Sequence, residues 1–171
     1  TMGLTETGSQ ITTNPMPPAI RKIGSPGTAF GNEIMIADDT LATVPTGTIG
    51  EILVRGANVM QGYLNQPEET AKTISPDGWL RTGDLGYLDQ DGYVFVSGRI
   101  KELIIKGGEN IAPREIDEAL LEHEAVLEAA AFAVPCENYG ERVEACIRVK
   151  EQMHASAPDL LGHCQTRLGK F

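Results

Sequence analysis

Alternating apolar and polar positions predict several short strands in the first half of the chain. Residues 33–37 and 51–55 are rich in Ile, Leu, Val or Met and are bounded by Gly, Asp or Pro, which is typical of short strands. Two further alternating runs flank Asp91-Gly92. This dipeptide is the strongest short-range hairpin signal, because a type I′ turn requires positive φ at both central residues. We therefore predict a β-hairpin over residues 79–98.

A two-residue loop at Asp91-Gly92 would fix the register of this hairpin. Its opposed pairs would be Gln90–Tyr93, Leu88–Phe95, Gly86–Ser97 and Asp84–Arg99. Directly opposed residues have Cα atoms about 4.5–5.5 Å apart, so Asp84 and Arg99 could reach one small polar ligand from the same face. A plain cross-strand ion pair is the simpler interpretation. A longer loop would shift the register and separate the pair.

The remaining patterns predict helices mixed with strands. Pro67 followed by two glutamates predicts a short helix that ends by Ile74, because proline and acidic residues favour a first turn. Beyond residue 100 we expect a buried strand over 103–105, a reversal at Gly107-Gly108, and a helix from Pro113 with Ile116, Ala119 and Leu120 on one face. Two strands should follow, a buried one over 126–134 and a half-exposed one over 143–149. A last helix is expected from residue 156 or 158, with Leu160, Leu161, Cys164 and Leu168 at helical spacing. The predicted fold class is α+β, with mainly antiparallel strands.

The composition excludes several classes of function. The 171 residues are 41% hydrophobic, which suits one globular domain or two small ones. The net charge of -10 argues against binding to nucleic acid or to an anionic membrane, since either requires a basic face. No apolar run approaches the length of a membrane span. The three cysteines lack metal-like spacing, so we expect reduced, partly buried thiols in a cytoplasmic protein.

Four short motifs, in order along the chain, resemble the core motifs of the adenylate-forming superfamily, which includes acyl-CoA synthetases and peptide-synthetase adenylation domains. They are Met2-Gly3-Leu4-Thr5-Glu6, Arg81-Thr82-Gly83-Asp84-Leu85, Gly98-Arg99-Ile100-Lys101, and Lys106-Gly107-Gly108-Glu109-Asn110-Ile111 with Pro113, Glu115 and Ile116 after it. Any one of them alone would be a weak signal. Together they cover nearly the whole chain.

The resemblance implies a division into two domains. Residues 1–100 would form the C-terminal part of a large AMP-binding domain, and residues 101–171 an incomplete, small and mobile α+β domain. Lys101 would be the hinge between them, because a hinge residue absorbs large backbone changes and need not be small. The family's phosphate loop would lie upstream of residue 1, and its catalytic lysine would follow Phe171. We therefore expect this chain alone to be inactive, and we do not assign the catalytic role to Lys170.

The resemblance also implies roles in nucleotide binding. Thr5 would contact the α-phosphate of the adenylate, and Glu6 would help to hold Mg²⁺, which binds proteins through one or two carboxylates plus substrate phosphates. Asp84 could accept hydrogen bonds from both ribose hydroxyls, and Arg99 suits ribose and phosphate together. Without the other motifs, Thr5 and Glu6 would read as a helix-capping loop.

The implied reaction joins a small-molecule carboxylic acid to coenzyme A. The acid and ATP would form acyl-AMP and pyrophosphate, and the CoA thiol would then attack the adenylate. Lys106, Gly107 and Gly108 would line the approach of CoA, because backbone without side chains lets a narrow ligand pass closely. A Gly-Gly turn that serves geometry alone is the alternative.

The sequence favours a stand-alone acyl-CoA synthetase as the function. The lysine at the hinge and the segment Gly107-Gly108-Glu109-Asn110 look more like CoA ligases than peptide-synthetase modules. The stretch from Gln10 to Lys22 is also similar to ligases of small or medium acids, including oxalate-type enzymes. An adenylation domain that loads a carrier protein and a non-catalytic nucleotide-binding fragment are the alternatives. The sequence leaves a homo-oligomer open.

Overall fold

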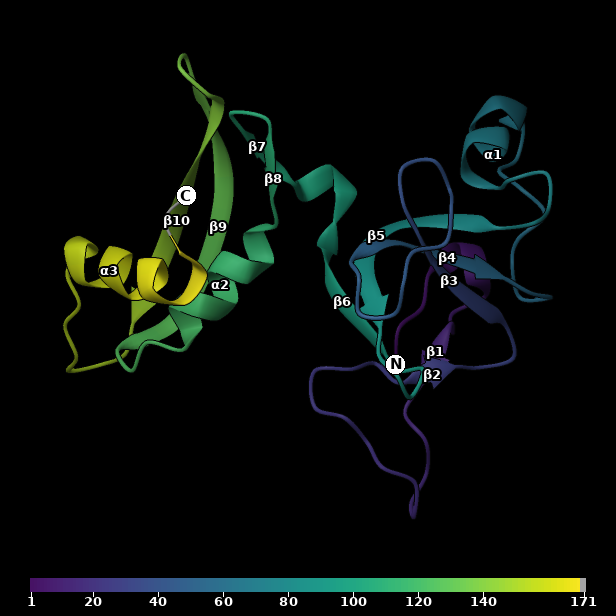
Figure 1. Ribbon diagram of the computed structural model, residues 1–171, viewed down its shortest axis with the longest axis horizontal. Coiled ribbons are helices and arrows are strands. Elements are labelled where there is room, and N and C mark those ends of the chain that lie inside the picture. The colour runs from purple at the N-terminus through teal and green to yellow at the C-terminus, as the bar shows by residue number, and fades with distance from the viewer. Residues whose placement is uncertain (170–171) are drawn as a thin grey trace. The chain divides into compact units, whose positions relative to one another are not determined.

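Antiparallel sheets organise the computed structural model, which describes residues 1–169. The chain divides into two units, Thr1–Ile100 and Lys101–Phe171 (Figure 1). The first unit contains η1 (Thr5–Thr7), β1 (Thr12–Thr13), β2 (Thr28–Ala29), β3 (Glu33–Ala37), β4 (Gly50–Arg55), α1 (Pro67–Thr73), β5 (Leu80–Leu88) and β6 (Val94–Arg99). After it come η2 (Ile100–Glu102), β7 (Ile104–Lys106), β8 (Glu109–Ile111), α2 (Pro113–Leu121), β9 (Val126–Cys136), β10 (Gly140–Val149) and α3 (Ala157–Leu168). The predicted α+β class is confirmed.

The first unit is built on a four-stranded sheet with the order β3-β4-β5-β6. Its buried core cluster is Ile36, Ile52 and Val94, one residue from each of three strands. β4 lies inside the sheet and is buried over most of its length, which explains its continuous apolar run. The predicted strands at 33–37 and 51–55 and the short helix from Pro67 are all confirmed.

The hairpin of β5 and β6 forms, but its loop has three residues instead of two. The Asp89 N–H donates to the Tyr93 carbonyl at 3.0 Å, and the Gly92 N–H donates to the Asp89 carbonyl at 3.0 Å. Leu88 therefore pairs with Val94, and the predicted Gln90–Tyr93, Leu88–Phe95 and Gly86–Ser97 pairs are wrong. The Asp89 carboxylate accepts hydrogen bonds from the N–H groups of Asp91 and Tyr93, both at 2.9 Å, and so draws Gln90 into the loop.

A β-bulge corrects the register before the motif residues are reached. The register shifts between Leu85 and Gly86, and beyond this point Leu85 pairs with Gly98 and Asp84 with Arg99. A bulge places one extra residue on one strand, which offsets the extra loop residue. The predicted Asp84–Arg99 pairing is therefore confirmed, although the loop that was expected to produce it is wrong.

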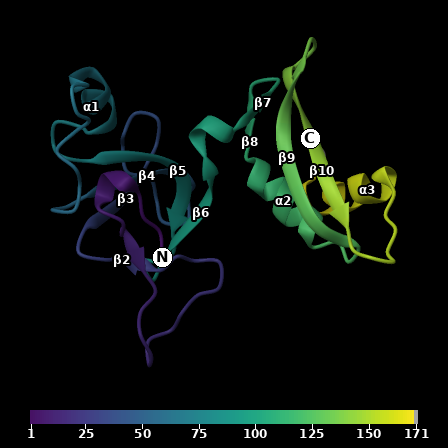
Figure 2. The ribbon, with the colours of Figure 1, turned by 180° about the vertical axis from the view of Figure 1, so that it is seen from behind.

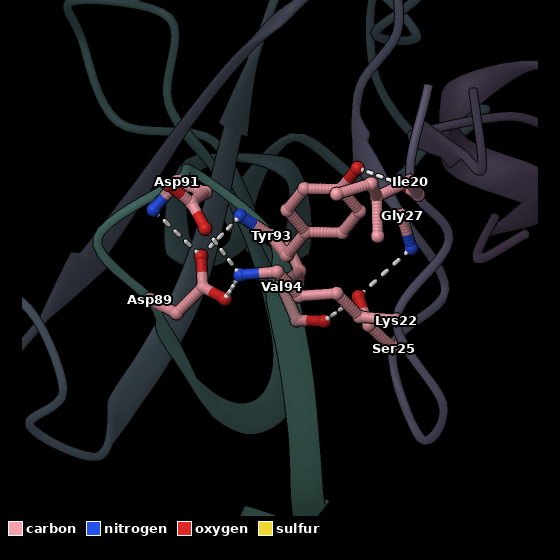
Figure 3. A network of polar contacts seen from close by, with 8 residues as sticks. All are labelled: Ile20, Lys22, Ser25, Gly27, Asp89, Asp91, Tyr93 and Val94. Atoms are coloured by element: carbon pink, nitrogen blue, oxygen red, sulfur yellow. Dashed lines mark hydrogen bonds and ion pairs between the residues drawn. The ribbon is translucent and has the colours of Figure 1, made fainter. Parts of the chain in front are cut away.

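A network of polar contacts fixes the irregular segment 14–27 against this hairpin (Figure 3). Lys22 pairs with Asp89 and, at 2.6 Å, with Asp91, and its ammonium lies 4.8 Å from the centre of the Tyr93 ring. The Ser25 hydroxyl donates to the Val94 carbonyl at 2.6 Å. The Lys22 ammonium holds the pKa of the Asp89 carboxyl below its usual value, mainly through their hydrogen bond.

The second unit has a four-stranded sheet with the order β8-β7-β10-β9. Helices α2 and α3 lie on the same face of β9 and β10, as the front and back views agree (Figures 1 and 2). The predicted face of α2 is confirmed, because Ile116, Ala119 and Leu120 are all buried. Ser156 caps α3, and its hydroxyl accepts a hydrogen bond from the Asp159 N–H at 3.3 Å.

Two expectations of burial in this unit are wrong for a common reason. Among the described residues of this unit, helices cover one face of the sheet, so β9 is buried at Val126 and exposes Leu127 and Phe132, whereas a buried strand was predicted. In β7, Ile104 is buried but Ile105 is half exposed. On α3, Leu160 is buried and Leu161 faces solvent. A short apolar run does not by itself distinguish two covered faces from one.

All three cysteines lie in the second unit. Cys136, Cys146 and Cys164 are free thiols as predicted, but Cys146 is exposed instead of partly buried. Burial raises the pKa of the Cys164 thiol. Within residues 1–169, no helix has the length and apolar character needed to cross a membrane. Lys170 and Phe171 lie outside the described residues.

Candidate functional site

The Thr5-Glu6 motif lies in a single tight turn, η1, that leaves the Thr5 side chain exposed. The buried Thr7 hydroxyl closes this turn by donating to the Leu4 carbonyl at 3.0 Å and accepting from the Leu4 N–H at 3.2 Å. Gly3 is required by a close approach, since a Cβ at this position would lie 1.7 Å from the Ser9 carbonyl oxygen. The turn that presents Thr5 is therefore held by the Thr7 hydrogen bonds and by the close approach at Gly3.

The segment 58–63 also holds this loop, through three hydrogen bonds. The Asn58 side-chain amide donates to the Thr7 carbonyl at 3.2 Å, and the Met60 N–H donates to the Glu6 carbonyl at 2.8 Å. The Tyr63 hydroxyl donates to Glu6 Oε1 at 2.8 Å. This hydrogen bond raises the pKa of Tyr63, because loss of the phenol proton would place two negative charges together. Sequence analysis missed Tyr63, since no local spacing rule connects residues so far apart in the chain.

The Arg81–Leu85 motif forms a second bulge, where β5 pairs with β4. Leu53 pairs with Arg81 and Glu51 with Leu85, so the residues between them bulge out of the ladder. Gly83 has φ +72°, a conformation that favours glycine. The buried Glu51 carboxylate holds the bulge: Oε1 accepts from the Gly83 N–H at 3.1 Å and Oε2 from Arg81 Nε at 2.9 Å. The role of Glu51 was also missed.

This bulge leads directly into the predicted ribose-binding pair. Arg99 Nε lies 2.9 Å from Asp84 Oδ1. The Asp84 side chain is 8% exposed and that of Arg99 is 57% exposed. The pair therefore combines a nearly buried acceptor with an exposed fork of donors, an arrangement suited to a ligand that offers hydroxyl and anionic groups together.

Glu6 has the chemistry required of a Mg²⁺ ligand. Its carboxylate is half-buried, and Mg²⁺ in proteins is bound through one or two carboxylates together with substrate phosphates. Within residues 1–169 there is no group of three or more His, Cys, Asp or Glu side chains arranged to hold a metal.

The remaining predicted site residues belong to the second unit or to the segment that begins it. Lys101 is exposed in η2. Gly107 and Gly108 form the two-residue loop between β7 and β8, with φ +61° and +92°, and Lys106 pairs with Glu109 across it. In the structure, Thr5 and Glu6 lie on one loop, and Asp84 and Arg99 pair across one hairpin. Contact of Lys101, Lys106, Gly107 and Gly108 with a ligand stays a prediction.

Two protein-family models match parts of this chain. Residues 1–64 match the family described as AMP-binding enzyme, and residues 115–171 match AMP-binding enzyme C-terminal domain. The chain belongs to the adenylate-forming, AMP-binding enzyme family. The matched regions lie on either side of the β5–β6 hairpin, so the roles of Asp84 and Arg99 in ligand binding stay predictions.

Several CoA ligases are similar to this chain. It is 49% identical to a sulfoacetate–CoA ligase of Cupriavidus necator over 100% of the chain and 34% of the relative. It is 39% identical to an oxalate–CoA ligase of Saccharomyces cerevisiae over 98% of the chain and 31% of that relative. The chain therefore spans about a third of the length of the curated relatives it matches.

Solved structures of AMP-binding enzymes have the same fold. ATP-bound MatB from Rhodopseudomonas palustris matches with a TM-score of 0.92 and 37% identity, over 99% of this chain and 34% of MatB. The o-succinylbenzoate CoA synthetase of Bacillus subtilis, in complex with its acyl-adenylate intermediate, matches with a TM-score of 0.83 and 39% identity, over 99% of this chain and 34% of that enzyme.

Proposed function

We propose that this chain is part of an ATP-dependent acid–thiol ligase that forms acyl-CoA, an acyl-CoA synthetase. The observation that carries the proposal is the Asp84–Arg99 pair, 2.9 Å apart on the β5–β6 hairpin, in a chain of the adenylate-forming family. Similarity to CoA ligases over the whole chain supports CoA as the acceptor. Residues 1–100 would be the end of the large domain, and residues 101–171 most of the small one.

In the first half-reaction, a carboxylate oxygen of the acid attacks the α-phosphorus of ATP and the bond to pyrophosphate breaks. Asp84 and Arg99 bind the ribose, and the exposed Thr5 hydroxyl donates to the α-phosphate. Glu6 would hold Mg²⁺, which neutralises charge on the phosphates when bound. These groups act by positioning and charge, because phosphoryl transfer needs little covalent chemistry from the protein.

In the second half-reaction, the CoA sulfur attacks the acyl carbon of the adenylate, its proton is lost, and AMP leaves. Lys101 would be the hinge about which the second unit turns between the two steps. The exposed Gly107-Gly108 loop would line the path of the thiol, with Lys106 beside it. The Lys106 ammonium, 5.8 Å from the centre of the Tyr139 ring, would attract the anionic end of CoA.

We further propose that the acid is small and carries a second acidic group. The names of the similar ligases support this, since sulfoacetate, oxalate and 2-succinylbenzoate each have two acidic groups. The stretch between Gln10 and Lys22 also supports an acid of limited size, since it resembles ligases of small or medium acids, including oxalate-type enzymes.

A pyrophosphate-release screen of the full-length protein tests the proposed function. Carboxylic acids with one and with two acidic groups are supplied with ATP, with and without CoA. We expect CoA-dependent turnover and a preference for acids with two acidic groups. Turnover that stops at acyl-AMP whether or not CoA is present would favour carrier-protein loading instead. Absence of pyrophosphate release with every acid would contradict the proposal.

A further inference from the structure

Tyr63 lies outside every motif considered above, yet its side chain contacts the proposed Mg²⁺ ligand directly. We propose that Tyr63 is a positioning residue that orients the Glu6 carboxylate toward the metal and the nucleotide phosphates. This inference rests on the proposed function, because it deepens the role of Glu6 in the first half-reaction.

The hydrogen bond between Tyr63 and Glu6 can run in only one direction. An ionised carboxylate can only accept, so the Tyr63 phenol donates its proton to Glu6 Oε1, at 2.8 Å. With Oε1 held, rotation of the carboxylate is restricted and Oε2 keeps one direction. The same segment fixes the backbone of Glu6, since the Met60 N–H donates to its carbonyl at 2.8 Å. Glu6 is thus held at both its main chain and its side chain.

Tyr63 is itself anchored by α1. Its N–H donates to the Thr70 hydroxyl at 2.9 Å, and this hydroxyl donates to the Gln66 carbonyl at 2.9 Å. Gly62 allows the close approach, because a Cβ there would lie 2.7 Å from Thr70 Cγ2. Helix α1 has no buried residue, so it adds little to the core of the unit. These contacts give it a different use, which is to hold the tyrosine against the Thr5-Glu6 loop.

The substitution Tyr63→Phe removes the hydroxyl and keeps the ring. Metal sites typically lose 10- to 100-fold in affinity when a group that orients a ligand is removed, so we expect the Mg²⁺ concentration that half-saturates ATP binding to rise about 10-fold. Isothermal titration of the full-length protein with ATP at increasing Mg²⁺ measures this. Affinity for AMP without Mg²⁺ should change less than about twofold. Adding Tyr63→Phe to Glu6→Gln should likewise have less than about a twofold further effect, because the group that Tyr63 orients is already altered.

Tyr93→Phe is a matched control. It also removes a phenol that donates a hydrogen bond within the first unit, here to the Ile20 carbonyl, far along the chain from the metal motif. Its Mg²⁺ dependence should equal that of the wild type. The inference is overturned if Tyr63→Phe keeps the wild-type Mg²⁺ dependence, or if it weakens AMP binding without Mg²⁺ as much as it weakens Mg²⁺-ATP binding. Failure of the proposed function looks different, since the wild-type protein would then show no Mg²⁺-dependent ATP binding.

Discussion

At the scale of single residues, Lys22 makes the stability of the first unit depend on pH. Its hydrogen bond is the largest cause of the lowered pKa of Asp89, and the reciprocal hydrogen bond raises the pKa of Lys22. A carboxyl with a lowered pKa contributes stability above its unfolded value, and this contribution is lost as the pH falls through the folded value. The raised pKa of Lys22 also contributes stability, and this contribution is lost as the pH rises above the ordinary value of 10.5.

We therefore expect Lys22→Met to destabilise the protein at pH 7 and by less at pH 3, because the Asp89 contribution begins to be lost once the pH falls below its ordinary pKa of 3.8. Urea unfolding followed by the fluorescence of Trp79, the single tryptophan, reports on the first unit. Lys72→Met is the matched control, because its pair with Glu69 is exposed and worth little. A gap between Lys22→Met and wild type that is the same at pH 3 and pH 7 would contradict the role of the ion pair.

At the scale of elements, two bulges determine where Asp84 is presented, one on β5 where it pairs with β4 and one on β6 opposite Leu85 and Gly86. Glu51 is the support of the first bulge, since it is 6% exposed and accepts from both Arg81 and the Gly83 N–H. In Glu51→Gln, an amide NH₂ would face one of these donors and leave it unsatisfied. We expect a loss of about 2 kcal/mol in unfolding free energy, measured by urea denaturation.

The exposed cross-strand pair of Glu33 with Arg55, on the same sheet, supplies the comparison for Glu51. Glu33→Gln removes one charge of that pair and should cost less than about 1 kcal/mol. Equal losses in the two variants would show that burial of Glu51 does not matter.

The Gly107-Gly108 loop can be tested for a role beyond its turn. Both residues have positive φ, so Gly108→Ala should cost about 1–2 kcal/mol of local strain, although no atom lies within 4 Å of the added Cβ. If the loop lines the thiol path, thioester formation should slow on the order of tenfold while ATP–pyrophosphate exchange is kept. Equal slowing of both half-reactions would indicate a role in geometry alone.

The β5–β6 hairpin could be predicted from the sequence only in part. Its existence followed from Asp91-Gly92, but the loop length did not, because Asp89 begins a type I turn with Gly92 in fourth place. That signal was present in the sequence. The compensating bulge after Leu85 had no such signal, since it depends on how two strands pack in a sheet.

At the scale of the whole molecule, motif order predicted the family, and periodicity predicted most elements of both units. Which sheet faces are covered could not be predicted, because it depends on where α2 and α3 dock. Residues that act through distant partners were missed for a related reason. Glu51 and Tyr63 contact motif residues 30 and 57 positions away, so only the folded chain connects them.

The central claim is that Asp84 and Arg99 hold the ribose of an adenylate. Its most direct test compares AMP with 2′,3′-dideoxy-AMP as ligands of the full-length protein and of Asp84→Asn, by isothermal titration, with Glu33→Gln as the control. Wild type and Glu33→Gln should prefer AMP by about 10- to 100-fold, the effect of one or two charge-assisted hydrogen bonds, and Asp84→Asn should lose most of this preference. An undiminished preference for AMP in Asp84→Asn would contradict the claim.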